Sequence, residues 1–190
     1  MTKDQIKLRS MILIALFAAI IGVLAQVTIP LPLVPITGQT LAIGLAATIL
    51  GSRNGTWAVL LYLLIGSAGV PVFAEFSAGI SKLFGPTGGF LVGFIPAAFI
   101  IGYYMEKRGF NFTNAIIANI IGMFITLAFG TIWLKISADL SWTAAFAGGF
   151  APFIIVGIIK AALASWIGIL VRNRLISSKL LFSSNVNVNQ

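Results

Sequence analysis

The stretch that decides the fold class is APFIIVGIIKAALASWIGILV, residues 151–171, an apolar run with a single charge at Lys160. It has about the 20 residues that an α-helix needs to cross a bilayer. Lys160 lies roughly 12 Å from the nearer end of the run at ~1.5 Å per residue. An ammonium group at that depth costs roughly 2.5–3.5 kcal/mol to insert, so it normally faces protein or a ligand. The run therefore predicts a membrane helix with a functional lysine. The alternative is a lysine that extends to the headgroups.

The composition of the whole chain agrees with a membrane protein. Of its 190 residues, 59% are hydrophobic and 8% are charged, whereas soluble domains are ~25% charged. Several apolar runs have spanning length, which favours an all-α membrane protein over a β-barrel. The chain has no cysteine and no histidine, so we expect no disulfide, no thiolate chemistry and no metal site.

The apolar runs predict a single domain over residues 1–176, followed by a polar tail over 177–190. The first run is too long for a typical signal peptide, so we expect it to be retained. A threonine can cap the second helix, which begins between residues 37 and 40 and pairs with the third through a turn at 51–55. The last helix begins at 146 or 152. The six predicted membrane helices cover residues 10–29, 40–50, 56–69, 87–105, 111–134 and 152–171.

Two loops rich in proline or glycine, residues 30–39 and 70–89, are themselves apolar and must be covered. The net charge of +8 would suggest nucleic acid in a soluble protein, but here the positive charges lie between the apolar runs. Nine lysines and arginines fall on one side of the predicted membrane and two, Lys82 and Lys135, on the other. This bias places both termini in the cytoplasm and the two structured loops outside. We expect lipid, and no nucleic acid, around the protein.

The acidic residues argue against an enzyme. None of them lies inside a predicted span, so the spans lack a pair of groups for nucleophilic or acid–base catalysis. The chain also lacks the phosphate-binding motif G-x-x-x-x-G-K-[ST], so nucleotide-driven work must come from a partner. The four acids are Asp4, Glu75, Glu106 and Asp139.

The outer half of the predicted bundle is a candidate site for a small amphiphilic anion. Lys160 supplies a positive charge, and the two apolar loops supply walls and a roof. Capping and loop hydrogen bonds are the alternative role for the polar neighbours, and packing is the alternative for the aromatic ones. Asn119 lies in the other half, where an interhelical hydrogen bond is expected. The polar candidates are Gln26, Thr37, Gln39, Glu75, Ser77 and Thr87; the aromatic ones are Phe73, Phe76, Phe84 and Phe90.

Particular strings within this layout resemble a known family. The runs IPLPLVPITGQTLAIGLAATILGSRNG and LYLLIGSAGVPVFAEFSAGISKLFGPTGGFLVGF contain P-x-T-x-Q-T-L at 35–41, G-x-P-V-F-A at 69–74 and G-P-T-G-G-[FY] at 85–90. In combination they resemble the biotin-specific S component of energy-coupling factor (ECF) transporters, the BioY family.

The resemblance implies a six-helix subunit of a prokaryotic plasma membrane that binds biotin from outside. It also implies partners, namely a transmembrane T component and two ATPase subunits, and no cofactor. The family's A-x-x-x-A pattern, which contacts the T component, is matched by Ala15 and Ala19. The family's last helix resembles D-x-x-K. Lys160 matches its lysine, but Gly157 stands at the position of the aspartate.

Together these arguments predict a biotin site. We expect Lys160 to pair with the valerate carboxylate, Gln39 or Thr37 to read the ureido edge, and Phe73 and Phe90 to enclose the bicycle. Two other functions remain open, a stand-alone secondary transporter of a small organic anion and a scaffold that binds no small molecule. Against the transporter, the spans contain no acidic or histidine proton relay and the chain shows no inverted repeat. The remaining predicted contacts are Val34 in the gating loop 30–39, and Glu75, Ser77 and Thr87.

Overall fold

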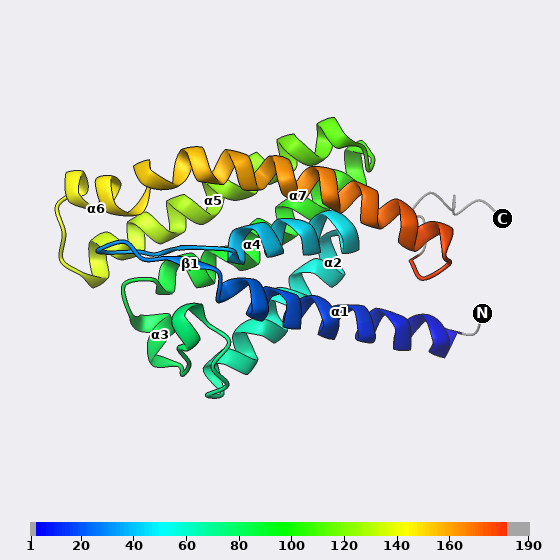
Figure 1. Cartoon of the computed structure of the whole chain (residues 1–190), viewed down its shortest axis with the longest axis horizontal. Helices are drawn as coiled ribbons and strands as arrows, with labels where there is room; N and C mark the ends of the chain where they lie inside the picture. Colours follow the sequence, from blue (N-terminus) through cyan, green and yellow to red (C-terminus); the bar gives the residue numbers. More distant parts are fainter. Residues whose placement is uncertain (1–2, 182–190) are drawn as a thin grey trace.

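The computed structural model describes residues 3–181 and shows an elongated bundle of helices, with α1 beginning and α7 ending at the same end (Figure 1). The long helix α2 packs against α1, α4 and α7, and α5 packs against α4 and α7. The long helices are α1 (Lys3–Ala25), α2 (Gln39–Ser67), α4 (Gly88–Arg108), α5 (Phe112–Ser137) and α7 (Ala151–Ser177). The short elements are β1 (Thr28–Ile29), β2 (Ile36–Thr37), the 3-10 helix η1 (Ala74–Phe76), α3 (Ser81–Phe84) and α6 (Trp142–Gly149).

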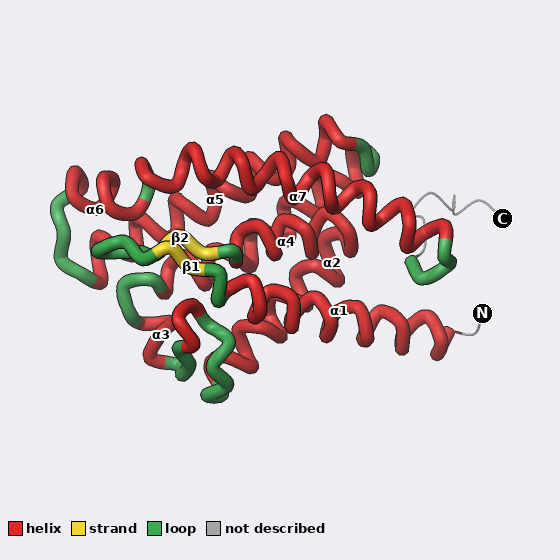
Figure 2. The backbone as a smooth tube through the Cα atoms, in the orientation of Figure 1, coloured by secondary structure: helices red, strands yellow, loops and turns green. Residues whose placement is uncertain are grey.

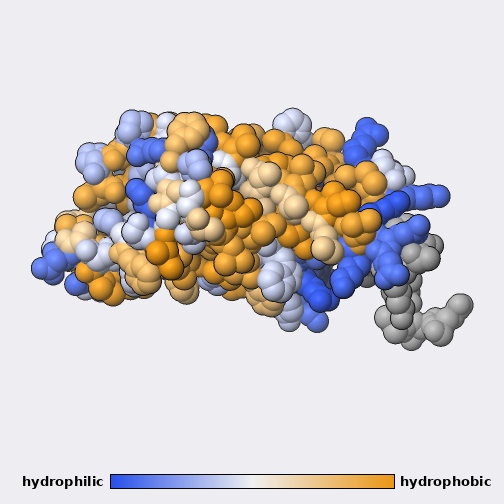
Figure 3. Space-filling view, turned by 90° about the horizontal axis from the view of Figure 1, so that it is seen from below, coloured by the Kyte–Doolittle hydropathy of each residue, from blue (hydrophilic) through white to orange (hydrophobic). Residues whose placement is uncertain are grey.

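The surface of the bundle suits a bilayer. Within residues 3–181, four helical segments are long and apolar enough to cross a membrane: Asp4–Ala25, Gly88–Arg108, Phe112–Ser137 and Trp142–Ser177. An apolar band covers the middle of the molecule, and hydrophilic residues gather toward its ends (Figure 3). Large apolar side chains such as Ile155 and Trp166 are exposed on α7. The prediction of a mostly helical membrane protein is confirmed.

Helix α2 consists of two helices that meet at Gly51. Gly51 has φ 82° and ψ −174°, a backbone conformation that side chains with a Cβ rarely adopt. The second half then folds back on the first, because a Cβ placed on Gly55 would lie 2.9 Å from the Cα of Ala47. The predicted hairpin is present, but its turn is one residue instead of five, because helical geometry resumes directly after Gly51.

Side chains of opposite charge stabilise the two helix ends at this break. The Glu106 carboxylate accepts hydrogen bonds from the backbone N–H and the hydroxyl of Ser52, both at 2.7 Å, where the second half begins. Arg172 donates to the Ile49 carbonyl, where the first half ends, and stacks on the Phe110 ring. An anion at a helix N-terminus and a cation at a C-terminus both complement the helix dipole.

The end of the molecule away from the α1 start and the α7 end holds the β-hairpin of β1 and β2 and the loop 70–89 (Figure 2). Strands β1 and β2 pair Thr28 with Thr37, so the first helix ends at Ala25, before the predicted residue 29. Gln26 donates to the Phe73 carbonyl and accepts from the Phe76 N–H, which joins the end of α1 to the loop 70–89. The sequence leaves two roles open for Gln26, ligand contact and, as the alternative, loop hydrogen bonding. The structure shows the loop hydrogen bonds.

Two other boundaries differ from the prediction. The N-cap of α2 is Gly38, which has no side chain, but the Thr37 hydroxyl accepts a hydrogen bond from the Gln39 N–H at 3.4 Å, so a threonine does bind a donor of the first turn, from one position before the N-cap. The last span is divided at Phe150 into α6 and α7, and Pro152 lies in the first turn of α7, where its missing N–H is tolerated. Helix α7 ends at Ser177; of the predicted tail, residues 182–190 lie outside the described part of the chain.

Candidate functional site

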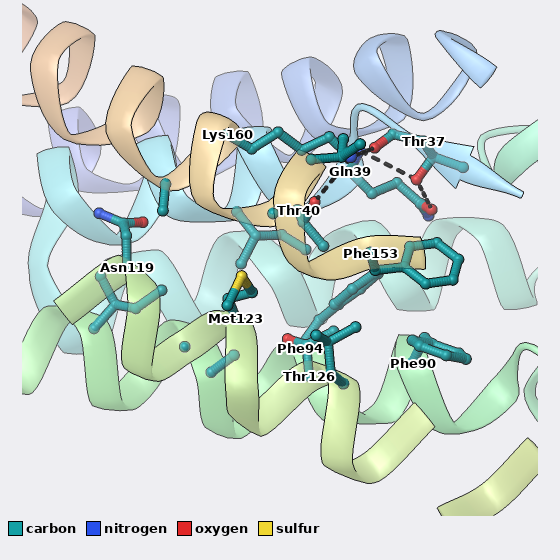
Figure 4. Close-up of a pocket in the computed structure, with 18 residues that line it drawn as sticks. Thr37, Gln39, Thr40, Phe90, Phe94, Asn119, Met123, Thr126, Phe153 and Lys160 are labelled. Carbon is teal, nitrogen blue, oxygen red and sulfur yellow. Dashed lines mark hydrogen bonds between the residues drawn. The ribbon is translucent and has the colours of Figure 1, made fainter. Parts of the chain in front are cut away.

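An elongated cavity lies between α2, α4, α5 and α7. Its empty space, including the open mouth, is about 780 Å³. Most of its wall is apolar, with a few polar groups (Figure 4). The lining residues are Thr37, Gln39, Thr40, Ile43, Phe90, Phe94, Ala97, Ile101, Asn119, Gly122, Met123, Thr126, Leu127, Phe153, Val156, Gly157, Lys160 and Ala161.

Lys160 is the cationic group of this cavity. Its Nζ donates to the Thr37 carbonyl at 2.6 Å and to the Thr40 hydroxyl at 3.4 Å, and neither acceptor is charged. The opposite face of α7 is exposed, with Ile155 73% and Ile159 54% accessible. Lys160 therefore points into the protein, as the functional interpretation predicts, and does not extend along α7 toward the headgroups. An ammonium has three donors, so one N–H is left for a ligand.

Gln39 is held by a chain of hydrogen bonds beside Lys160. The Thr37 hydroxyl donates to Gln39 Oε1 at 2.7 Å, and Gln39 Nε2 donates to the Tyr62 hydroxyl at 2.6 Å. Gln39 is 5% exposed, so these bonds fix its amide at the junction of β2 and α2. The protein itself thus uses the amide oxygen and one of the two N–H groups. Only the second N–H is left to read a ligand.

Aromatic and sulfur-containing side chains form the apolar wall. The rings of Phe90 and Phe153 lie 6.1 Å apart, centroid to centroid. Met123 fills the space that a side chain at position 157 would take, because a Cβ on Gly157 would lie 2.4 Å from the Met123 sulfur. Gly157, where this chain departs from the D-x-x-K pattern, thus lies in the cavity wall, and the Met123 thioether occupies the space beside it.

A second cavity, called the outer cavity because the loops 30–39 and 70–89 line it, adjoins the first and holds the other predicted contacts except Val34. Its lining includes Phe73, Glu75, Ser77 and Thr87, and it shares Thr37, Gln39, Phe90 and Phe94 with the inner cavity. The structure therefore separates the predicted contacts into two groups, of which only Lys160, Thr37, Gln39 and Phe90 lie around the inner cavity.

Local contacts account for several residues outside the inner cavity. The Ser77 hydroxyl donates to the Ala74 carbonyl at 2.6 Å. Phe73 packs edge-on against Tyr62, with ring centroids 5.5 Å apart. Val34 is buried in the apolar cluster around Phe90. Phe76 and Phe84 are exposed, 72% and 69%, as are Ala15 and Ala19 on the surface of α1.

The sequence prediction missed most of the α5 wall. Asn119, Met123 and Thr126 all line the inner cavity. Their spacing of four and then three residues places them on one face of a helix. Polar groups in register within an apolar span were the signal that could have identified this face. Asn119 also makes the interhelical hydrogen bonds that were expected of it.

Comparisons with known proteins agree on one family. The chain matches the sequence model of the BioY family over residues 1–177. It is 47% identical over 163 residues to the biotin transporter BioY2 of Lactococcus lactis subsp. cremoris, covering 86% of this chain and 90% of that protein. It is 39% identical to the biotin transporter BioY of Thermotoga maritima, covering 85% and 95%.

A solved structure has the same fold. The crystal structure of the S-component for biotin from an ECF-type ABC transporter superposes with a TM-score of 0.83 at 28% sequence identity. The match covers 91% of this chain and 95% of that one.

Proposed function

Because this chain belongs to the BioY family, we propose that its inner cavity is a biotin site in which Lys160 binds the carboxylate. The protein is the biotin-binding S component of an ECF-type transporter, a multi-pass protein of the plasma membrane, and not an enzyme. The observation that carries the site is the partly buried Lys160, whose hydrogen-bond partners are uncharged.

The chemistry of the cavity matches the parts of biotin. A carboxylate beside Lys160 would supply the opposite charge that the wall lacks and so offset the desolvation of the ammonium. The apolar bicycle would lie beside the Met123 thioether, in the part of the cavity that extends from Lys160 toward Asn119 (Figure 4). Phe90 and Phe153 would close the opposite end. Thr37 and Gln39 adjoin Lys160, so in this pose they contact the carboxylate end of the ligand.

The same proposal includes the topology and the partners. The two halves of α2 add to the four long spans to give six membrane helices, with the α1 start and the α7 end in the cytoplasm. The hairpin and the loop 70–89 then lie outside, where Val34 belongs to the gate and Phe73, Glu75, Ser77 and Thr87 line the entrance.

Coupling to the energy source would occur through α1. The exposed Ala15 and Ala19 lie one helical turn apart, and such small residues let a partner helix approach closely. This surface supports contact with the T component, which would join the protein to two ATPase subunits.

Calorimetry on the purified protein with biotin and with biotin amide tests the proposal. We expect biotin to bind, to be found by mass spectrometry in protein purified from biotin-containing cells, and to bind more tightly than the neutral amide. Equal affinities would contradict the role of Lys160. Absence of biotin binding would contradict the proposed ligand. Accumulation of biotin in liposomes under a proton gradient, without ATP, would instead favour a stand-alone transporter.

A further inference from the structure

A second polar group lies in the inner cavity and has no role in the carboxylate site. Asn119 is 5% exposed and projects from α5 into the cavity at the end away from Phe90 and Phe153 (Figure 4). An amide buried in an apolar surrounding is costly unless each of its polar atoms finds a partner.

The nitrogen of this amide is fully engaged. Asn119 Nδ2 donates to the Ala115 carbonyl at 2.9 Å, the Thr48 hydroxyl at 3.0 Å and the Ser165 hydroxyl at 3.2 Å. A carbonyl only accepts, and the Ser165 hydroxyl proton is donated to the Ala161 carbonyl. Both partners therefore require a donor, which fixes the nitrogen on their side and turns the oxygen the other way.

The oxygen is left uncovered. Among residues 3–181, no side chain or backbone group donates a hydrogen bond to Asn119 Oδ1, and this atom faces the Met123 side of the cavity (Figure 4). Gly44 preserves the space around it, because a Cβ at this position would lie 2.3 Å from Oδ1. The cavity thus ends in a fixed, unpartnered acceptor.

We propose that Asn119 Oδ1 accepts a hydrogen bond from a ureido N–H of the ligand and thereby determines specificity at the inner end of the cavity. The inference rests on the proposed biotin site. Lys160 contacts Thr40, whereas Asn119 Oδ1 lies against Gly44, and these two residues of the same helix are about 6 Å apart at ~1.5 Å per residue. The cavity therefore offers a cation and, further along α2, an acceptor, which suits a ligand with a carboxylate and a separate N–H donor.

The test compares biotin with an analogue in which both ureido nitrogens are replaced by CH2 groups. For the unaltered protein we expect the analogue to bind at least about tenfold more weakly, the value of one hydrogen bond to a buried acceptor. In Asn119→Ala the ratio of the two affinities should fall about tenfold.

Ser165→Ala is the matched control, because it removes a partner of the same amide but leaves Oδ1 in place. We expect it to alter stability without altering the affinity ratio. An unchanged ratio in folded Asn119→Ala would overturn the inference. If that variant does not fold, Gly44→Ala, whose methyl group would overlap Oδ1 and displace it, takes its place with the same expected and contrary results. If the unaltered protein binds no biotin, the proposed function fails instead.

Discussion

Replacement of Lys160 by methionine separates the charge of this residue from its volume. The ammonium has two hydrogen bonds within the protein, to the Thr37 carbonyl and the Thr40 hydroxyl, and one N–H for a ligand. A hydrogen bond to a charged group contributes about 1.5–3 kcal/mol. Since 1.4 kcal/mol is a factor of ten in affinity, the dissociation constant for biotin should rise about 10- to 150-fold.

The loss of affinity caused by Lys160→Met should depend on the charge of the ligand. Biotin amide has no carboxylate, so its affinity should be lower than that of biotin in the unaltered protein and nearly unchanged by Lys160→Met. Isothermal titration calorimetry of both ligands with both proteins gives the coupling between the two groups. Lys82→Met is the matched control, because Lys82 is an exposed lysine that lines the outer cavity.

Two results would refute this account. If folded Lys160→Met binds biotin within about threefold of the unaltered protein, Lys160 does not hold the carboxylate. If the variant weakens biotin and its amide equally, the lysine acts on the shape of the cavity and not on the ligand's charge. A comparable loss in Lys82→Met would move the anion site to the outer cavity.

Three further predictions concern the rest of the molecule. Glu106→Ala should lower the free energy of unfolding by about 1–2 kcal/mol in detergent, because it removes the cap from the second half of α2; equal stability would exclude that role. A cysteine at the buried Val34 should react with a thiol reagent more slowly when biotin is bound, and one at the exposed Leu33 should not change; unchanged labelling at both argues against a gate. Tryptophan at Ala15 or Ala19 should abolish copurification with the ATPase subunits and leave biotin affinity intact; retained copurification would place the partner elsewhere.

The fold was predictable where the signal is local. Hydropathy located the long spans, because insertion of an apolar helix depends on its own composition. Their predicted ends differ from those of the observed helices by up to seven residues. The boundary at Ala25 and the one-residue turn at Gly51 were not predictable. The first depends on strand pairing with Thr37, and the second on a cap that Glu106 supplies from another helix.

Of the candidate site, too, only some residues were predictable from the sequence. Lys160 stands out in the sequence because a charge within an apolar span is costly wherever the helix lies. Phe73 and Glu75 were plausible from the order of elements, but the structure places them in the outer cavity. Asn119 seemed remote from Lys160 along the predicted helices, yet both line one cavity.

By itself, the sequence determined the membrane class, the long helices and the family strings, and it singled out Lys160. Each of these follows from the composition and pattern of one segment. Only the tertiary structure decided that the lysine points inward to Thr37 and Thr40, that Met123 fills the space beside Gly157, and that Asn119 turns its oxygen into the cavity. These features depend on contacts between side chains of α2, α5 and α7. Packing between segments that are distant in the chain cannot be inferred from the sequence of any one segment.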